Sequence, residues 1–152
     1  MYSSIDIANV FVQLAYKEEK LIRPMKLLKL TYIAYGYYYA FFDKPLFHGR
    51  IEAWKYGPVI PELYDAIKMF GKKPVEPFYM QTISTSNVDS KTVEFLASMW
   101  KFYKNFDGLQ LSSRTHEEGT PWHKTWDGTR DKAIEADTIK EYYSELISNN
   151  VK

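Results

Sequence analysis

Residues 25–42 constrain the fold more than any other stretch of this chain. Their spacing predicts a helix with apolar or aromatic side chains on nearly all of its faces. One face carries Leu27, Leu30, Ala34, Tyr37 and Phe41, and the opposite face carries Leu28, Tyr32, Tyr35, Tyr39 and Phe42. Such a helix buries its surface only when other elements surround it. We therefore predict a central helix from about Met25 to Phe42.

This helix is not expected to cross a membrane. Its uncharged part, residues 30–42, is 13 residues long, and a membrane span needs ~20. The N-terminal residues show no basic segment followed by an apolar run, so we expect no signal peptide. We expect a soluble cytoplasmic protein without membrane insertion.

The remaining segments predict mainly helices around the central one. Ser3 or Ser4 is the expected cap of a first helix. Later helices are expected over about residues 61–70, 89–106 and 109–117, and a further turn is expected after Pro121. A capping box at Thr138 and Glu141 predicts the start of a last helix. We expect Gly36 to permit the close approach of a neighbouring backbone. The predicted fold is mainly α: a compact single-domain bundle over residues 1–152, with at most a small two-stranded β element.

A second stretch, residues 51–62, combines a short strand, a sharp turn and a helix start. The strand alternates apolar and polar residues, and Gly57-Pro58 interrupts it because proline restricts the backbone on both sides of its peptide bond. Pro61 suits the first turn of a helix. A strand within residues 81–88 is the expected pairing partner of residues 51–54.

Composition excludes several kinds of chemistry. The absence of cysteine excludes disulfides, thiolate metal sites and a cysteine nucleophile, and no phosphate-binding glycine loop or G-x-S-x-G nucleophile motif is present. His116 and His123 are seven residues apart, but Gly119 and Pro121 interrupt a shared helix. We predict no catalytic residue, cofactor or metal, and a metal-dependent hydrolase is the least favoured alternative.

Nucleic-acid binding is a second alternative. Arg23, Lys26 and Lys29 lie with Tyr32 near the start of the central helix, where cations and backbone N–H groups suit phosphate. The formal charge of +1, from 20 basic and 19 acidic residues, gives no overall attraction to polyanions. A regulator that binds the DNA of its own operon therefore stays the weaker reading.

Aromatic residues favour a protein-binding module instead. They make up 17% of the chain, and 13 of them are tyrosine. Trp54, Tyr56, Trp122 and Trp126 fall at predicted turns and helix ends, and tryptophan and tyrosine are common interface anchors. For any single one of them, a place in a corner of the core is the stronger interpretation, and it is the group as a whole that favours an interface.

Three motifs together resemble one family. Residues 25–36 (MKLLKLTYIAYG), residues 52–64 (EAWKYGPVIPELY) and the pattern Leu111-x-x-x-Thr115-His116-x-x-x-x-Pro121-Trp122 are similar, in order and spacing, to the Panacea domain family of SocA-like antitoxins, formerly called phage-associated proteins. The resemblance runs from Ile7 to Tyr143.

The resemblance implies an antitoxin of a bacterial or phage toxin–antitoxin pair that acts by binding and is not an enzyme. It implies a small protein toxin as partner, neutralised directly or delivered to an ATP-dependent protease by an adaptor mechanism. The predicted partner-binding residues are Lys26, Lys29, Tyr32, Trp54, Lys55, Tyr56, Pro58, His116 and Trp122. We expect the three motifs to meet in space.

Overall fold

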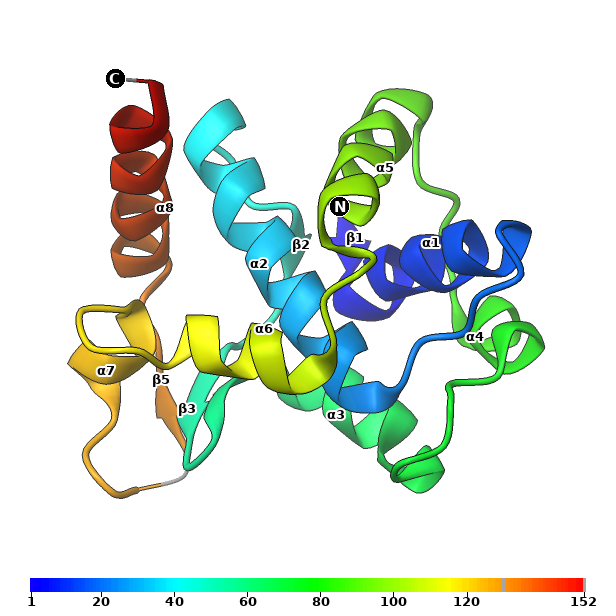
Figure 1. Ribbon diagram of the computed structural model, residues 1–152, viewed down its shortest axis with the longest axis horizontal. Helices are drawn as coiled ribbons and strands as arrows, with labels where there is room; N and C mark the ends of the chain where they lie inside the picture. The colour runs from blue at the N-terminus through cyan, green and yellow to red at the C-terminus, as the bar shows by residue number, and fades with distance from the viewer. Residues whose placement is uncertain (130, 152) are drawn as a thin grey trace.

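The central helix is α2, Pro24–Phe42, in a computed structural model that describes residues 1–129 and 131–151. Figure 1 shows it passing through the middle of the molecule, between α8 on one side and α1 and α5 on the other. Its residues from 27 to 36 are all buried. Within the described residues, no helix is both long and apolar enough to span a membrane.

Seven further helices surround α2 in the described part of the chain. They are α1 (Ser4–Lys17), α3 (Pro61–Ile67) with the short 3-10 helix η1 (Lys68–Phe70), α4 (Pro77–Ile83), α5 (Ser90–Tyr103), α6 (Gly108–Thr115), α7 (Pro121–Thr125) and α8 (Ala136–Val151). The prediction of a mainly helical fold around a central helix is confirmed.

Local sequence signals set most of these helix starts. Ser3 and Asp6 form a reciprocal capping box at α1, and the Asp89 side chain caps α5 by accepting from the Thr92 N–H. Pro61 occupies the first turn of α3, as predicted, and Gly71 follows η1 at a φ of +57°.

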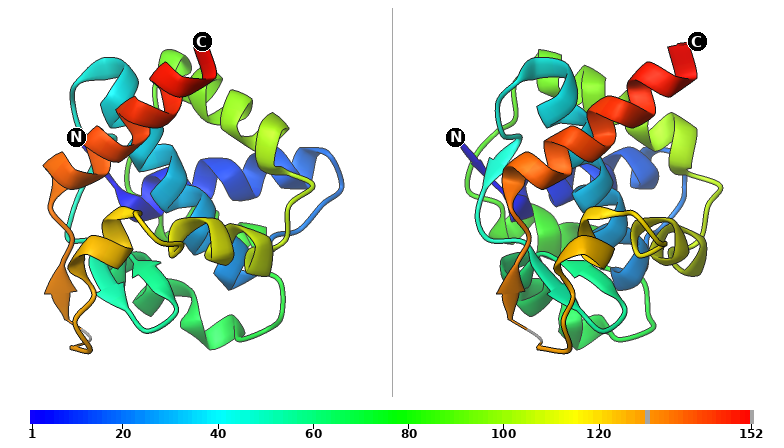
Figure 2. Two further views of the ribbon diagram at one scale, coloured as in Figure 1. Left: turned by 60° about the vertical axis from the view of Figure 1, so that its left-hand side comes forward. Right: turned by 90° about the vertical axis from the view of Figure 1, so that its left-hand side faces the viewer.

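Helix α8 packs across α2, as both views of Figure 2 show. The contact is close at Gly36, where an added Cβ would lie 2.2 Å from Cδ2 of Tyr143. The neighbour at Gly36 is therefore an aromatic ring, and the prediction of a neighbouring backbone was wrong.

The β structure is more extensive than predicted. Strands β3 (Glu52–Trp54) and β4 (Gly57–Val59) form an antiparallel hairpin, and β5 (Lys132–Ala133) pairs with the other edge of β3. Strands β1 (Tyr2–Ser3) and β2 (Phe47–His48) form a separate parallel pair. Gly57 and Pro58 thus belong to a strand, and a two-residue turn at Lys55-Tyr56 reverses the chain.

A predicted strand and a predicted helix start were wrong for physical reasons. Residues 81–88 do not pair with β3: residues 81–83 belong to α4, which the Glu76 side chain caps, and the two edges of β3 are taken by β4 and β5. Helix α8 begins at Ala136, before the predicted cap Thr138, because the Thr138 and Ile139 N–H groups both bond the Glu135 carbonyl.

Candidate partner-binding site

The β3–β4 hairpin is the centre of the candidate site. Its register places Trp54 opposite Gly57 and Ala53 opposite Pro58, so Lys55 and Tyr56 project from the tip. Gly57 has a φ of +117°, which L side chains rarely adopt. The Tyr56 side chain is 68% exposed, which makes it the most accessible aromatic of the predicted set.

Lys29 of α2 binds the backbone of the hairpin. Its Nζ donates to the carbonyl oxygens of Pro58, at 2.8 Å, and Tyr56, at 3.3 Å. The residue is only 5% exposed, and burial lowers the pKa of its ammonium group to about 8. A Cβ at Gly57 would lie 2.9 Å from this Nζ, so the glycine is needed for the approach.

Helices α6 and α7 hold the hairpin from another direction. The Ser112 hydroxyl donates to the Tyr56 carbonyl at 3.1 Å, and Nε1 of Trp122 donates to the Trp54 carbonyl at 2.5 Å. The His116 ring packs against Trp122 with centroids 5.4 Å apart, and its Nδ1 donates to the Ser112 carbonyl. The three motifs therefore meet at the hairpin.

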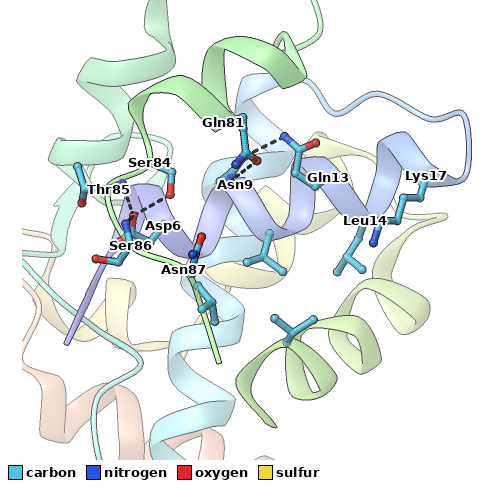
Figure 3. Close-up of a pocket in the computed structure, with 13 residues that line it drawn as sticks. Asp6, Asn9, Gln13, Leu14, Lys17, Gln81, Ser84, Thr85, Ser86 and Asn87 are labelled. Carbon is cyan, nitrogen blue, oxygen red and sulfur yellow. Dashed lines mark hydrogen bonds between the residues drawn. The ribbon is translucent and has the colours of Figure 1, made fainter. Parts of the chain in front are cut away.

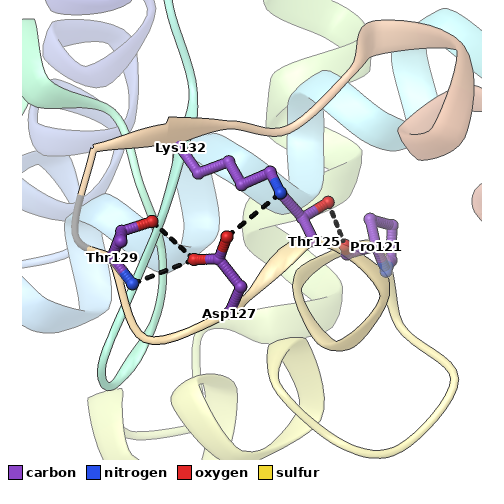
Figure 4. A network of polar contacts seen from close by, with 5 residues as sticks. All are labelled: Pro121, Thr125, Asp127, Thr129 and Lys132. Atoms are coloured by element: carbon purple, nitrogen blue, oxygen red, sulfur yellow. Dashed lines mark hydrogen bonds and ion pairs between the residues drawn. The ribbon is translucent and has the colours of Figure 1, made fainter.

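The segment after α7 connects this helix to the hairpin. Trp126 stacks on Trp122 with centroids 5.8 Å apart. Asp127 then forms a turn in which its carboxylate accepts from the backbone N–H and hydroxyl of Thr129 and pairs with Lys132 at 3.1 Å (Figure 4). The Thr129 hydroxyl is the main cause that lowers the pKa of Asp127 to about 2. This turn leads into β5, which pairs with β3 and connects α7 to the hairpin.

A cavity of about 500 Å³ opens beside the hairpin, and we call it the hairpin groove. It lies between the first turns of α2, the hairpin, the end of α3 with η1, and Trp126. Its apolar lining includes Leu28, Trp54, Val59, Tyr64 and Ile67. Trp54 and Tyr64 meet edge to face with centroids 5.0 Å apart. The volume lies within the range of ligand pockets, about 300–1,000 Å³.

The predicted site residues divide into three groups. Lys29, Trp54, Lys55 and Tyr56 line the hairpin groove. Pro58 belongs to the hairpin, and its carbonyl accepts from Lys29; Trp122, packed against His116, donates to the hairpin backbone at Trp54.

Lys26 and Tyr32 lie away from the groove. Lys26 donates to the Lys104 carbonyl at the end of α5, and Tyr32 is 1% exposed and meets Tyr143 edge to face. The structure gives both residues internal contacts, and their role in partner binding stays a prediction.

The basic residues at the start of α2 do not form one outward surface. Nε of Arg23 donates to the Lys72 carbonyl, Lys26 to the Lys104 carbonyl, and Lys29 to the hairpin. Each cation therefore contacts the backbone of a different segment. This arrangement disfavours the phosphate contact of the nucleic-acid alternative.

A second cavity, of about 540 Å³, lies between α1 and the segment after α4 (Figure 3). The buried Asp6 carboxylate in its wall accepts from the Ser84 hydroxyl and from the N–H groups of Thr85 and Ser86. Burial raises the pKa of Asp6, but these bonds and the Ser3 N–H outweigh it and hold the pKa below its usual value. Asp6 thus serves to join α1 to this segment. No predicted site residue lines this cavity.

The two histidines of the metal alternative have separate roles. His116 contacts Ser112 and Trp122, whereas Nδ1 of His123 accepts from the Gly119 N–H. In the part of the chain that the structure describes, no three His, Asp or Glu side chains are grouped as metal ligands.

Comparison with known proteins identifies the family. The model of the family "Antitoxin SocA-like, Panacea domain" matches residues 27–123, which extend from the first turns of α2 to α7 and include the hairpin. The chain belongs to this family. The match covers most elements that build the candidate site.

A curated relative agrees with this assignment to the SocA-like antitoxins. Antitoxin SocA of Caulobacter vibrioides (strain NA1000 / CB15N) is 36% identical over 124 residues, which cover 76% of this chain. The chain spans 66% of the relative's length. No solved structure matches the chain.

Sequence reasoning missed several residues of the candidate site in this SocA-like chain. Tyr64, Ile67 and Lys68 line the groove, and Ser112 bonds the hairpin tip. The positions of Tyr64 and Ile67, three residues apart on a helix that directly follows the hairpin, were a usable signal. Ser112 gave none, because a single serine on a short helix has no distinguishing pattern.

Proposed function

We propose that this protein is the antitoxin of a toxin–antitoxin pair and that it neutralises a small protein toxin by binding it directly. The binding surface is the hairpin tip, Lys55 and Tyr56, together with the hairpin groove. Family membership supports the antitoxin role. The observation that supports the surface is the convergence of three distant segments on one hairpin, which holds Tyr56 exposed on a rigid support.

A rigid exposed aromatic beside an apolar cavity is a favourable anchor for a protein partner. Tyrosine supplies a large contact area at low entropic cost, and anchors of this type supply much of the energy of many interfaces. The hydrogen bonds below the tip fix its backbone before the partner arrives. Binding therefore orders little of the hairpin.

Paired expression tests this proposal. The small open reading frame beside the gene is induced alone and together with this protein, and the two products are then copurified. We expect growth to stop without this protein, to recover with it, and the two proteins to elute together. Recovery accompanied by protease-dependent loss of the toxin, without a stable complex, would instead favour the adaptor mechanism and contradict neutralisation by binding alone.

Matched variants locate the surface. Tyr56→Ala should weaken the complex by about tenfold or more, as expected for an anchor residue. The control Phe78→Ala removes an aromatic side chain that is 76% exposed on α4, away from the groove, and should leave the affinity unchanged. Equal affinities for the two variants, both shown to be folded by circular dichroism, would remove the hairpin tip from the interface.

A further inference from the structure

The hairpin groove has an uneven charge. Three lysines, Lys29, Lys55 and Lys68, line it, whereas no aspartate or glutamate is among the described residues of its lining. The chain as a whole carries 20 basic and 19 acidic residues. The positive character is therefore local to this cavity and not a consequence of composition.

Two of these lysines lie at the exposed rim. Nζ of Lys55 lies 5.4 Å from the Tyr56 ring centroid, and no ion pair involves it within the described residues. Lys68 pairs with Asp65 at 3.3 Å, but both side chains are exposed and such pairs contribute little. Within the described residues the Lys55 ammonium thus has no ion-pair partner, and Lys68 has only an exposed one, which an incoming carboxylate can replace.

The third lysine lies deeper and lacks a counter-charge. The Lys29 ammonium has three hydrogens, and two carbonyls of the hairpin accept from it. Nothing else in the described part of the chain accepts from it. A buried cation without an acidic partner is costly, so a carboxylate brought into the groove would be bound strongly.

The rest of the lining requires an apolar occupant. Leu28, Val59 and Ile67 present aliphatic surface, and the Trp54 and Tyr64 rings complete the wall. Burial of an apolar side chain against such a wall is favourable in proportion to the area removed from water. A purely ionic ligand would leave this surface unused.

We infer that the hairpin groove binds an acidic amphipathic segment of the partner, with leucine, isoleucine or phenylalanine side chains against the apolar wall and aspartate or glutamate against Lys29, Lys55 and Lys68. The inference rests on the proposed function, because it names the chemistry that the toxin presents to this site. The three lysines and the apolar wall line one cavity, so a segment that combines acidic and apolar side chains fits it best.

A matched pair of dye-labelled synthetic peptides tests this inference with the full chain. Both peptides carry leucine and phenylalanine at the same helical spacing. All remaining positions are glutamate in one peptide and lysine in the other. Fluorescence anisotropy should show binding of the glutamate peptide at least about tenfold tighter than the lysine peptide. Its affinity should fall as salt screens the rim charges.

Charge-reversed variants assign the preference to the groove. The double variant Lys55→Glu/Lys68→Glu should lower the affinity for the glutamate peptide about tenfold or more and raise the affinity for the lysine peptide. The control Lys91→Glu/Lys101→Glu makes the same change in net charge at exposed positions of α5 and should leave the preference intact.

Each outcome decides the inference. Equal binding of both peptides, binding of neither, or the same loss in both double variants would overturn it. Failure here with successful growth rescue leaves the proposed function standing. A groove-dependent glutamate preference, in a cell where this protein does not restore growth against the product of the neighbouring gene, would contradict the proposed function and retain the specificity of the groove.

Discussion

Gly57 shows how one residue without a side chain positions the whole candidate site. Its backbone has a φ of +117°, and the space that a Cβ would occupy is filled by the Lys29 ammonium and bordered by the His116 ring. Both the turn and the Lys29 contact below it therefore depend on glycine. A larger residue must strain the backbone and displace Lys29 together.

The two effects at Gly57 can be separated with Gly49. Gly49 has a φ of +132°, but nothing lies within 4 Å of an added Cβ. We expect Gly49→Ala to cost only the backbone strain, about 1–3 kcal/mol, and Gly57→Ala to cost more because it also displaces Lys29. Urea denaturation of both variants measures the difference. Equal losses of unfolding free energy would show that crowding at Lys29 contributes nothing.

Lys29 also predicts a dependence of stability on pH. Burial lowers its pKa to about 8 in the folded protein, whereas an unfolded lysine keeps its usual value of about 10.4. Between these values the unfolded state binds more protons, so the free energy of unfolding rises with pH, by at most ~1.4 kcal/mol per unit.

The comparison with Lys29→Met isolates this effect. We expect wild-type stability, relative to Lys29→Met, to increase from pH 8 to pH 10, roughly the window between the two pKa values. From about pH 10 unfolded tyrosines ionise, while burial raises the pKa of Tyr35 to about 12, so the stability of both proteins falls there and the difference between them is unaffected. Parallel stability curves for the two proteins across the window would contradict a lowered Lys29 pKa.

At the scale of elements, the contact between α2 and α8 shows why helix propensity does not predict the effect of an alanine at Gly36. Alanine is usually better than glycine in a helix interior by about 1 kcal/mol. At Gly36 the methyl group would lie 2.2–2.8 Å from three ring carbons of Tyr143, which is itself buried. The ring also packs against the rings of Tyr32, Tyr37 and Tyr142, so moving it disturbs these contacts.

We therefore expect Gly36→Ala to destabilise the protein by about 1–3 kcal/mol, opposite in sign to its helix propensity. Thermal unfolding measures the change. The double variant Gly36→Ala/Tyr143→Leu should be less destabilised than the sum of the two single variants, because leucine vacates the ring position. A stabilised Gly36→Ala protein would contradict the close contact.

Some elements were predictable because their signals are local. The capping serine of α1, Pro61 at the start of α3 and Gly71 after η1 act through their own backbone neighbours. The partners of β3 were not predictable in this way. Strand β5 lies far along the chain, and its two residues carry no alternating pattern that identifies it.

At the scale of the whole molecule, the core extends beyond the family match. The match covers residues 27–123, but Ile7 and Phe11 of α1 and Ile139 of α8 have no exposed surface. Tyr143 of α8 is also buried against α2. The two outer helices therefore complete the cover of the central helix.

We predict that a fragment of residues 27–123 does not fold cooperatively, because α2 then exposes apolar surface on two sides. Far-UV circular dichroism with a urea titration tests this, with the full chain as control. A sharp unfolding transition of the fragment would show that α1 and α8 are dispensable for the fold.

The sequence by itself determined the mainly helical fold, the central position of α2 and the family. Continuous apolar patterning and three spaced motifs can be read from the order of residues along the chain. Only the tertiary structure decided which motif residues share a site. Lys26 and Lys29 are three residues apart, yet one contacts the end of α5 and the other the hairpin. Adjacent turns of a central helix face different neighbours, and these neighbours come from distant parts of the chain.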